Sequence, residues 1–162
     1  MPRIVPNLWF DTNAEEAAEF YVSVFPSSRI NDVIRYTEAG PGEPGTVLTI
    51  DFELDGQPFT GINGGPMFTF DEAVSFLIEV EDQTELDYYW DTLSAGGKEG
   101  ECGWLTDRFG LSWQVVPGGM EELFADPDPS KAERAMQAMF SMKKLDIAAL
   151  QAAADGAPSE AM

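Results

Sequence analysis

The chain has 162 residues, of which 44% are hydrophobic, so it is long enough for one ordinary domain with a packed core. Its 29 acidic and 9 basic residues give a net charge of −20, which argues against binding to nucleic acids and anionic membranes because like charges repel. The absence of histidine excludes nucleophiles activated by a histidine base and metal sites that depend on imidazole.

The chain begins with a short predicted strand whose side chains alternate. Within IVPNLWF, residues 4–10, Leu8 and Phe10 lie on one face of the strand. Asn7 and Trp9 lie on the other face.

A helix and three further strands are expected in the first half of the chain. Asn13 is a suitable N-cap for the helix, and Pro26 ends it because proline cannot continue the backbone hydrogen bonds. The predicted elements are a strand over 4–10, a helix over 14–25, and strands over 29–37, 46–54 and 58–62, the last two joined by the turn DGQ.

The same order of elements repeats from residue 74. The strand VSFLIEV places Ser75, Leu77 and Glu79 on one face. A helix over residues 82–97 follows, with Asp82 or Thr84 as its cap.

The stretch CGWLTDRFGLSWQVVP, residues 102–117, predicts a strand, a tight turn and a closing strand. In the closing strand the uncharged Gln114 lies on the face opposite Trp113 and Val115.

After Pro117 the pattern becomes helical, with a break at residues 126–130. Met136, Met139 and Phe140 belong to an apolar stripe, which we expect to pack on the body of the protein or on a second subunit.

The repeated strand–helix–strands module and several longer segments resemble the vicinal oxygen chelate superfamily, and within it the PhnB-like group, often labelled 3-demethylubiquinone-9 3-methyltransferase. The segments are NLWFDTNAEEAAEFYVSVFPSS, INGGPMFTF, AVSFLIEVEDQTELDYYWDTLSAGG, CGWLTDRFGLSWQVVP and AMQAMFSMKKLDIAALQAA. The resemblance implies an α+β fold of two paired βαβββ modules in a single domain, residues 1–162. Its parts are a first module over about 1–66, a second over about 67–118, and a C-terminal helical extension over about 119–155.

Metal-using members of this superfamily hold a divalent ion with histidine or glutamate at four strand positions. Here those positions fall on Asn7 (Pro6 without a gap), on Gly61 or Asn63, on Ser75 and on Gln114. All are neutral and are poor ligands unless carboxylates lie beside them. We therefore expect the metal site to be lost and predict no cofactor, with a divalent metal as the alternative.

The resemblance also implies a ligand-binding cleft between the two modules. Trp9 and Phe59 would line its apolar part, and Glu79, on the same face as Ser75, is a weak candidate for a general base. The predicted cleft comprises Asn7, Trp9, Phe59, Gly61, Asn63, Ser75, Leu77, Glu79 and Gln114.

The sequence leaves three functions open. The first is a metal-free protein that binds a neutral or cationic small molecule, as bleomycin-resistance relatives do. The second is a metal-dependent lyase, isomerase or dioxygenase. The third is a protein whose cleft is filled by its own side chains and which acts only through its dimer surface. Methyl transfer is not expected, because the chain lacks the alternating strands and helices with a glycine-rich first turn that a doubly wound methyltransferase needs.

The cellular setting is predicted from what the chain lacks. It has one cysteine, no apolar run of membrane-spanning length and no signal-peptide pattern, which favours the cytoplasm. The family habit implies a homodimer.

Overall fold

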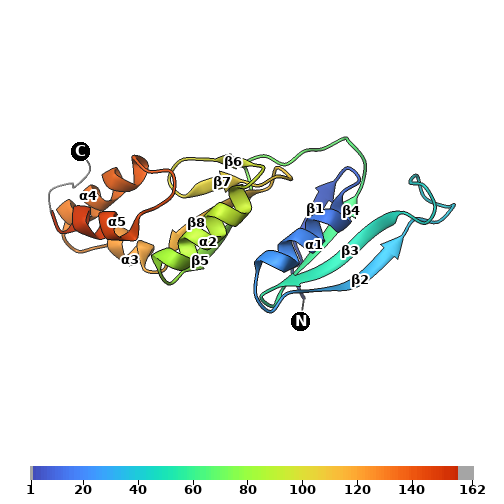
Figure 1. Cartoon of the computed structure of the whole chain (residues 1–162), viewed down its shortest axis with the longest axis horizontal. Helices are drawn as coiled ribbons and strands as arrows, with labels where there is room; N and C mark the ends of the chain where they lie inside the picture. The colour runs from blue at the N-terminus through green and yellow to red at the C-terminus, as the bar shows by residue number, and fades with distance from the viewer. Residues whose placement is uncertain (1, 157–162) are drawn as a thin grey trace. The chain divides into compact units, whose positions relative to one another are not determined.

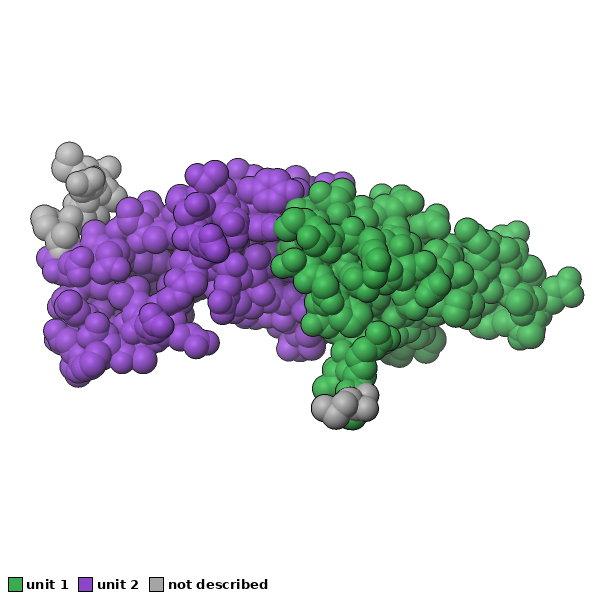
Figure 2. Space-filling view, turned by 90° about the horizontal axis from the view of Figure 1, so that it is seen from below, with its two compact units in different colours: residues 1–70 green, residues 71–162 purple. Residues whose placement is uncertain are grey.

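The computed structural model describes residues 2–156, and the chain divides into two compact units, residues 1–70 and 71–162 (Figure 2). Each unit contains a four-stranded mixed sheet and a helix against it (Figure 1). The α+β fold of two βαβββ modules predicted from the sequence is confirmed.

In the first unit the strand order is β1-β4-β3-β2, and the helix α1 packs on β3 and β4 (Figure 1). The first and last strands, β1 and β4, pair in parallel, and the other pairs are antiparallel. The elements are β1 (Asn7–Phe10), α1 (Ala14–Val24), β2 (Arg29–Arg35), β3 (Val47–Leu54) and β4 (Gln57–Asn63).

The core of the first unit lies between α1 and the sheet. Ala17 and Tyr21 are fully buried, at the helical spacing that places both on one face. Beneath them the rings of Phe52 and Phe59 stack with their centres 5.5 Å apart. The small alanine allows α1 to lie close to the sheet, and the aromatic rings fill the space between them.

The second unit repeats this arrangement with the strand order β5-β8-β7-β6. Here β5 and β8 are the parallel pair, and α2 packs on β8, β7 and β5. Asp82, one of the two predicted caps, caps α2 by accepting a hydrogen bond from the backbone of Glu85. The elements are β5 (Ser75–Val80), α2 (Gln83–Ser94), β6 (Lys98–Glu99), β7 (Trp104–Thr106) and β8 (Ser112–Pro117).

The tight turn between β7 and β8 is built on the buried Asp107. Its carboxylate accepts hydrogen bonds from the backbone of Phe109 and Leu111 and from the indole of Trp113. These three donors satisfy a charge that is only 2% exposed. The turn residues of the sequence therefore fix the register of this hairpin.

Three helices follow the second sheet: α3 (Met120–Phe124), α4 (Pro129–Phe140) and α5 (Ile147–Ala154). Asp128 and Asp146 cap α4 and α5. No helix among residues 2–156 is long and apolar enough to cross a membrane.

The segment between α4 and α5 holds these helices to the rest of the second unit. Leu145 is completely buried, and Met142 accepts a backbone hydrogen bond from Cys102. The side chain of Gln83 on α2 donates to the carbonyl of Leu145 and accepts from the backbone of Ile147. The C-terminal helices are thus anchored by apolar burial and by backbone hydrogen bonds.

Candidate functional site

The second sheet has one face covered by α2 and one face that α2 does not cover, here called the open face. The register pairs Leu77 with Gln114 and Gln114 with Trp104, which places all three on the open face. Ser75 and Glu79 share this face because alternate residues of a strand point the same way. Sequence alternation therefore grouped Ser75, Leu77, Glu79 and Gln114 as the register does.

A pocket of about 490 Å³ lies on this open face, here called the second-sheet pocket. Its floor includes Leu77, Glu79, Trp104 and Gln114, and its walls come from α3 and α4. The size and the mostly apolar lining, with a few polar groups, are typical of small-molecule sites. The residues that the helices contribute include Met120, Glu121, Glu122, Phe124, Met139 and Phe140.

Gln114 lies on the pocket floor, paired with Leu77 on one side and Trp104 on the other, and is half-buried. Its amide nitrogen donates a hydrogen bond of 2.9 Å to the hydroxyl oxygen of Ser75. Its amide oxygen has no partner among the described residues and can accept a hydrogen bond. The pair orients Gln114 and leaves its amide oxygen and its second N–H available for a ligand.

Cys102 also lines the pocket, in the turn before β7. Burial raises the pKa of its thiol above the usual value, and the nearby Glu101 carboxylate raises it further. A thiolate is the reactive form of cysteine, so this side chain acts as an apolar wall and not as a nucleophile.

In the first unit, Asn7 and Trp9 lie on the face opposite α1, and both make bonds within their own unit. Asn7 is exposed and donates to the carbonyl of Val5. The indole nitrogen of Trp9 donates to the carbonyl of Gly65, and its ring meets Phe68 edge-to-face with a centre distance of 5.0 Å. The Trp9 ring is therefore already packed by the end of its own unit.

Phe59, Gly61 and Asn63 lie on the face covered by α1, which differs from the prediction that they share a face with Asn7 and Trp9. The parallel register pairs Gly61 with Leu8, whose side chain points to α1. A side chain at Gly61 would meet Ala14, so α1 fills that space.

In this position the side chain of Asn63 caps α1 and binds the backbone of β3. It is 9% exposed, its side-chain oxygen accepts a bond of 2.9 Å from the first helical amide at Ala14, and its side-chain nitrogen donates a bond of 3.0 Å to Val47. Asn13, predicted as the cap of α1, makes no such side-chain bond. The helix is capped by a residue 49 positions later in the chain.

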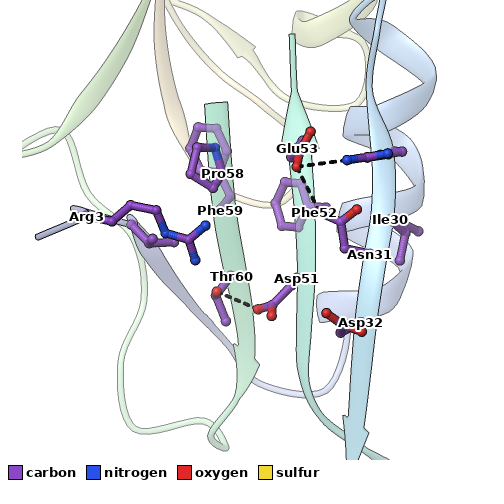
Figure 3. A pocket seen from close by; sticks show the side chains of 12 residues that line it. Arg3, Ile30, Asn31, Asp32, Asp51, Phe52, Glu53, Pro58, Phe59 and Thr60 are labelled. Atoms are coloured by element: carbon purple, nitrogen blue, oxygen red, sulfur yellow. Dashed lines mark hydrogen bonds and ion pairs between the residues drawn. The ribbon is translucent and has the colours of Figure 1, made fainter. Parts of the chain in front are cut away.

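A second hollow of about 490 Å³ lies on the first sheet (Figure 3). Its polar groups largely satisfy one another: Thr60 donates to Asp51 at 2.7 Å, and Asn31 donates to Glu53 at 3.2 Å. Arg3 also lines it (Figure 3). With internal pairs and few apolar walls, this hollow is a weaker candidate for a ligand site than the second-sheet pocket.

The four positions of the superfamily's metal ligands do not fit a divalent ion here. Asn63 and Gly61 face α1, Asn7 is bonded to Val5, and Ser75 is bonded to Gln114. All these groups are neutral, whereas hard divalent cations require carboxylates among their oxygen ligands. Within the described part of the chain, no three cysteine or carboxylate side chains lie close enough together to hold a metal ion.

The sequence did not reveal several residues that line the pocket. Trp104 alternates with Leu105 in a three-residue strand, which is too short for a pattern to assign its face. Phe124 and Phe140 belong to helices whose packing partners sequence periodicity cannot identify. Only the strand register and the placement of the helices in the structure show that these three residues line the same pocket as Gln114.

Comparisons with known proteins agree with this fold. A family model described as 3-demethylubiquinone-9 3-methyltransferase matches residues 2–116. The PhnB protein from Bacillus cereus, which carries the same family description, is 36% identical; the match covers 72% of this chain and 100% of that one, with a TM-score of 0.66. No protein of curated function matched the chain.

More distant solved structures share the fold. A protein from Pseudomonas aeruginosa is 19% identical, with 72% of this chain and 98% of that chain covered and a TM-score of 0.60. The fosfomycin resistance protein FosX from Listeria monocytogenes is 14% identical, with 75% and 97% covered and a TM-score of 0.51.

The two βαβββ units and these matches define a protein of the vicinal oxygen chelate superfamily. Within it, the chain belongs to the 3-demethylubiquinone-9 3-methyltransferase family, the PhnB-like group. The family model ends at residue 116, so α3, α4 and α5 lie beyond it.

Proposed function

We propose that this protein binds a small organic molecule in the second-sheet pocket and does so without a metal ion. The observation that carries the proposal is the pocket itself, which has a volume of about 490 Å³ and a largely apolar lining around the acceptor oxygen of Gln114. Such a lining removes apolar ligand surface from water, while the few polar groups set its orientation.

The neutral side chains at the inherited ligand positions support the metal-free part of the proposal. Ser75 and Gln114 use their polar groups on each other, which a metal-binding pair would not do. Glu79 stays a candidate general base, since its exposed carboxylate on the pocket floor could reach a bound molecule. Turnover is not part of the proposal.

We do not extend the methyl transfer in the family description to this chain. The doubly wound fold that binds dinucleotide-like cofactors places helices on both faces of a largely parallel sheet. Each sheet here has one parallel strand pair and a single helix between its strands. The homodimer implied by the resemblance and the cytoplasmic location predicted from the composition also stay predictions.

The pocket can be tested with two matched tryptophan variants of the untagged full-length chain. Leu77 lines the pocket and is 51% exposed, so Leu77→Trp should fill the pocket without disturbing the core. Val74 is 64% exposed and does not line the pocket, so Val74→Trp is the control. Both variants should keep the wild-type melting temperature.

The readout is a thermal-shift screen of aromatic and apolar compounds, followed by calorimetry of the hits. We expect hits that bind the wild type and the Val74→Trp variant and lose at least about tenfold in affinity with Leu77→Trp, because the added ring takes the ligand's place. Hits that bind all three proteins equally, or a screen without hits, would overturn the proposal. Metal analysis of the same preparation tests the metal-free part, and near-stoichiometric divalent metal would favour the metal-dependent enzyme.

A further inference from the structure

We infer that the second-sheet pocket selects a protonated amine with an aromatic or apolar body, and that the C-terminal helices, α3 above all, supply this selectivity. The inference rests on the proposed binding function and adds the ligand class and the element that recognises it. It follows from the charges, the hydrogen-bonding groups and the aromatic rings that line the pocket.

The charged side chains found in the pocket lining all have the same sign. Glu79 on β5 and Glu121 and Glu122 on α3 line it, and among residues 2–156 no lysine or arginine does. All three carboxylates are exposed to solvent and can reorient toward a ligand. An anionic ligand would be repelled, both by these groups and by the net charge of −20.

Acceptors predominate among the side-chain hydrogen-bonding groups named here that remain available in the pocket. Gln114 uses one amide N–H on Ser75, and its oxygen and its second N–H are left for a ligand. Carboxylates accept hydrogen bonds and, when ionised, cannot donate them. A ligand that carries N–H donors and a positive charge can bond to all the acceptors named here, whereas a ligand rich in acceptors can bond only to the remaining N–H of Gln114.

Aromatic side chains supply the rest of the lining. Trp104 and Phe124 are half-buried, and Phe140 is 62% exposed at the end of α4. A cation within about 6 Å of such a ring is attracted by the negative face of its π system, most strongly with tryptophan. Met120 and Met139 complete an apolar wall that can adapt to a flat ring system.

The helix α3 is fixed to the sheet and so presents its two carboxylates at a defined place. Gly118 donates a backbone hydrogen bond of 2.8 Å to Val80 at the end of β5, and Met120 is 9% exposed. Gly119 has a φ of 87°, which turns the chain sharply from β8 into α3. Since the family model ends at residue 116, this charged wall lies outside the family model.

The test uses three probes that share one ring system and differ in charge: 2-naphthylmethylammonium, 2-naphthylmethanol and 2-naphthoate. Their affinities for the full-length protein are measured by calorimetry at low and at physiological ionic strength. We expect the ammonium probe to bind about tenfold more tightly than the alcohol, because three partly solvated carboxylates each contribute a few-fold. The naphthoate should bind most weakly, and salt should reduce the differences.

The contribution of α3 is tested with the double variant Glu121→Gln/Glu122→Gln. Its control is Glu16→Gln/Glu19→Gln on α1, which removes the same charge from exposed residues outside the pocket. We expect the first variant to weaken ammonium binding about fivefold and to leave the alcohol unchanged, and the control to change neither much.

The outcomes separate this inference from the binding function. If the three probes bind equally and Leu77→Trp weakens all of them, the pocket binds small molecules without selecting amines, and only the inference fails. Binding of none of the probes at millimolar concentration also overturns it, while the compound screen decides the binding function separately. Equal effects of the two double variants would overturn the role of α3.

Discussion

Replacing Asn63 with alanine should destabilise the protein without affecting the second-sheet pocket. The side chain makes two buried hydrogen bonds, of 2.9 Å with Ala14 and 3.0 Å with Val47. Each such bond contributes about 1 kcal/mol net, and a buried partner that is left unsatisfied costs about 1–3 kcal/mol. Because water can reach some of the freed groups, we expect a loss of about 3 kcal/mol in the free energy of unfolding.

The assay is urea unfolding followed by circular dichroism, with the melting temperature as a second measure. A loss of about 3 kcal/mol corresponds to about 6–12 °C in the melting temperature of a chain of this size. Asn7→Ala is the matched control, since Asn7 is exposed and bonds only to Val5; it should lose less than about 0.5 kcal/mol. A loss below about 1 kcal/mol for Asn63→Ala would refute the structural role of this side chain.

Three further measurements follow from single features of the second unit. The Cys102 thiol, whose pKa is raised by burial and by Glu101, should react with iodoacetamide more slowly than cysteine in an unfolded peptide, and urea should remove the difference. Ser112→Ala should raise the free energy of unfolding by about 1 kcal/mol, because the buried hydroxyl has no hydrogen-bond partner among the described residues; a loss of stability would contradict this. A hydrogen bond from Gln83 and the nearby Lys144 ammonium lower the pKa of the Asp87 carboxyl group. Hydrogen bonds to Asp87 and Asp91 raise the pKa of the Lys144 ammonium despite its burial. The stabilisation from Asp87 is therefore lost as the pH falls below about 3.8, and the stabilisation from Lys144 is lost as the pH rises above about 10.5. Amide protection factors in α5 should drop outside this pH window. In the Lys144→Met variant these protection factors should depend less on pH.

Alternation along the strands predicted the strands and grouped half of the candidate site, while the family resemblance implied the fold. Ser75, Leu77 and Gln114 were grouped correctly because the period of a strand is two and the face of each is visible in the sequence. The same reasoning grouped Phe59 with Asn63 but placed both on the wrong side. Alternation tells which residues share a face and does not tell which face the helix covers.

Tertiary contacts determine what sequence reasoning could not reach. Asn13 stands at the cap position of α1, yet the side chain of Asn63, on a distant strand, accepts the bond from the helix start. Likewise, Phe124 and Phe140 line the pocket because the C-terminal helices are anchored by the burial of Leu145 and by the hydrogen bond from Gln83. Such contacts join residues far apart in the chain, and local patterns contain no signal for them.

The parallel pairing of β5 with β8 affects the nascent chain. The second sheet is complete only when β8 ends at Pro117, and the ribosome adds residues from the N-terminus at about 5–20 per second. Until residues 120–140 have left the ribosome and folded, Leu77 and Trp104 lie on a sheet face without its helical wall. Exposed apolar surface of this kind attracts chaperones and promotes aggregation. The helices that form the pocket wall therefore also shield this face once synthesis is complete.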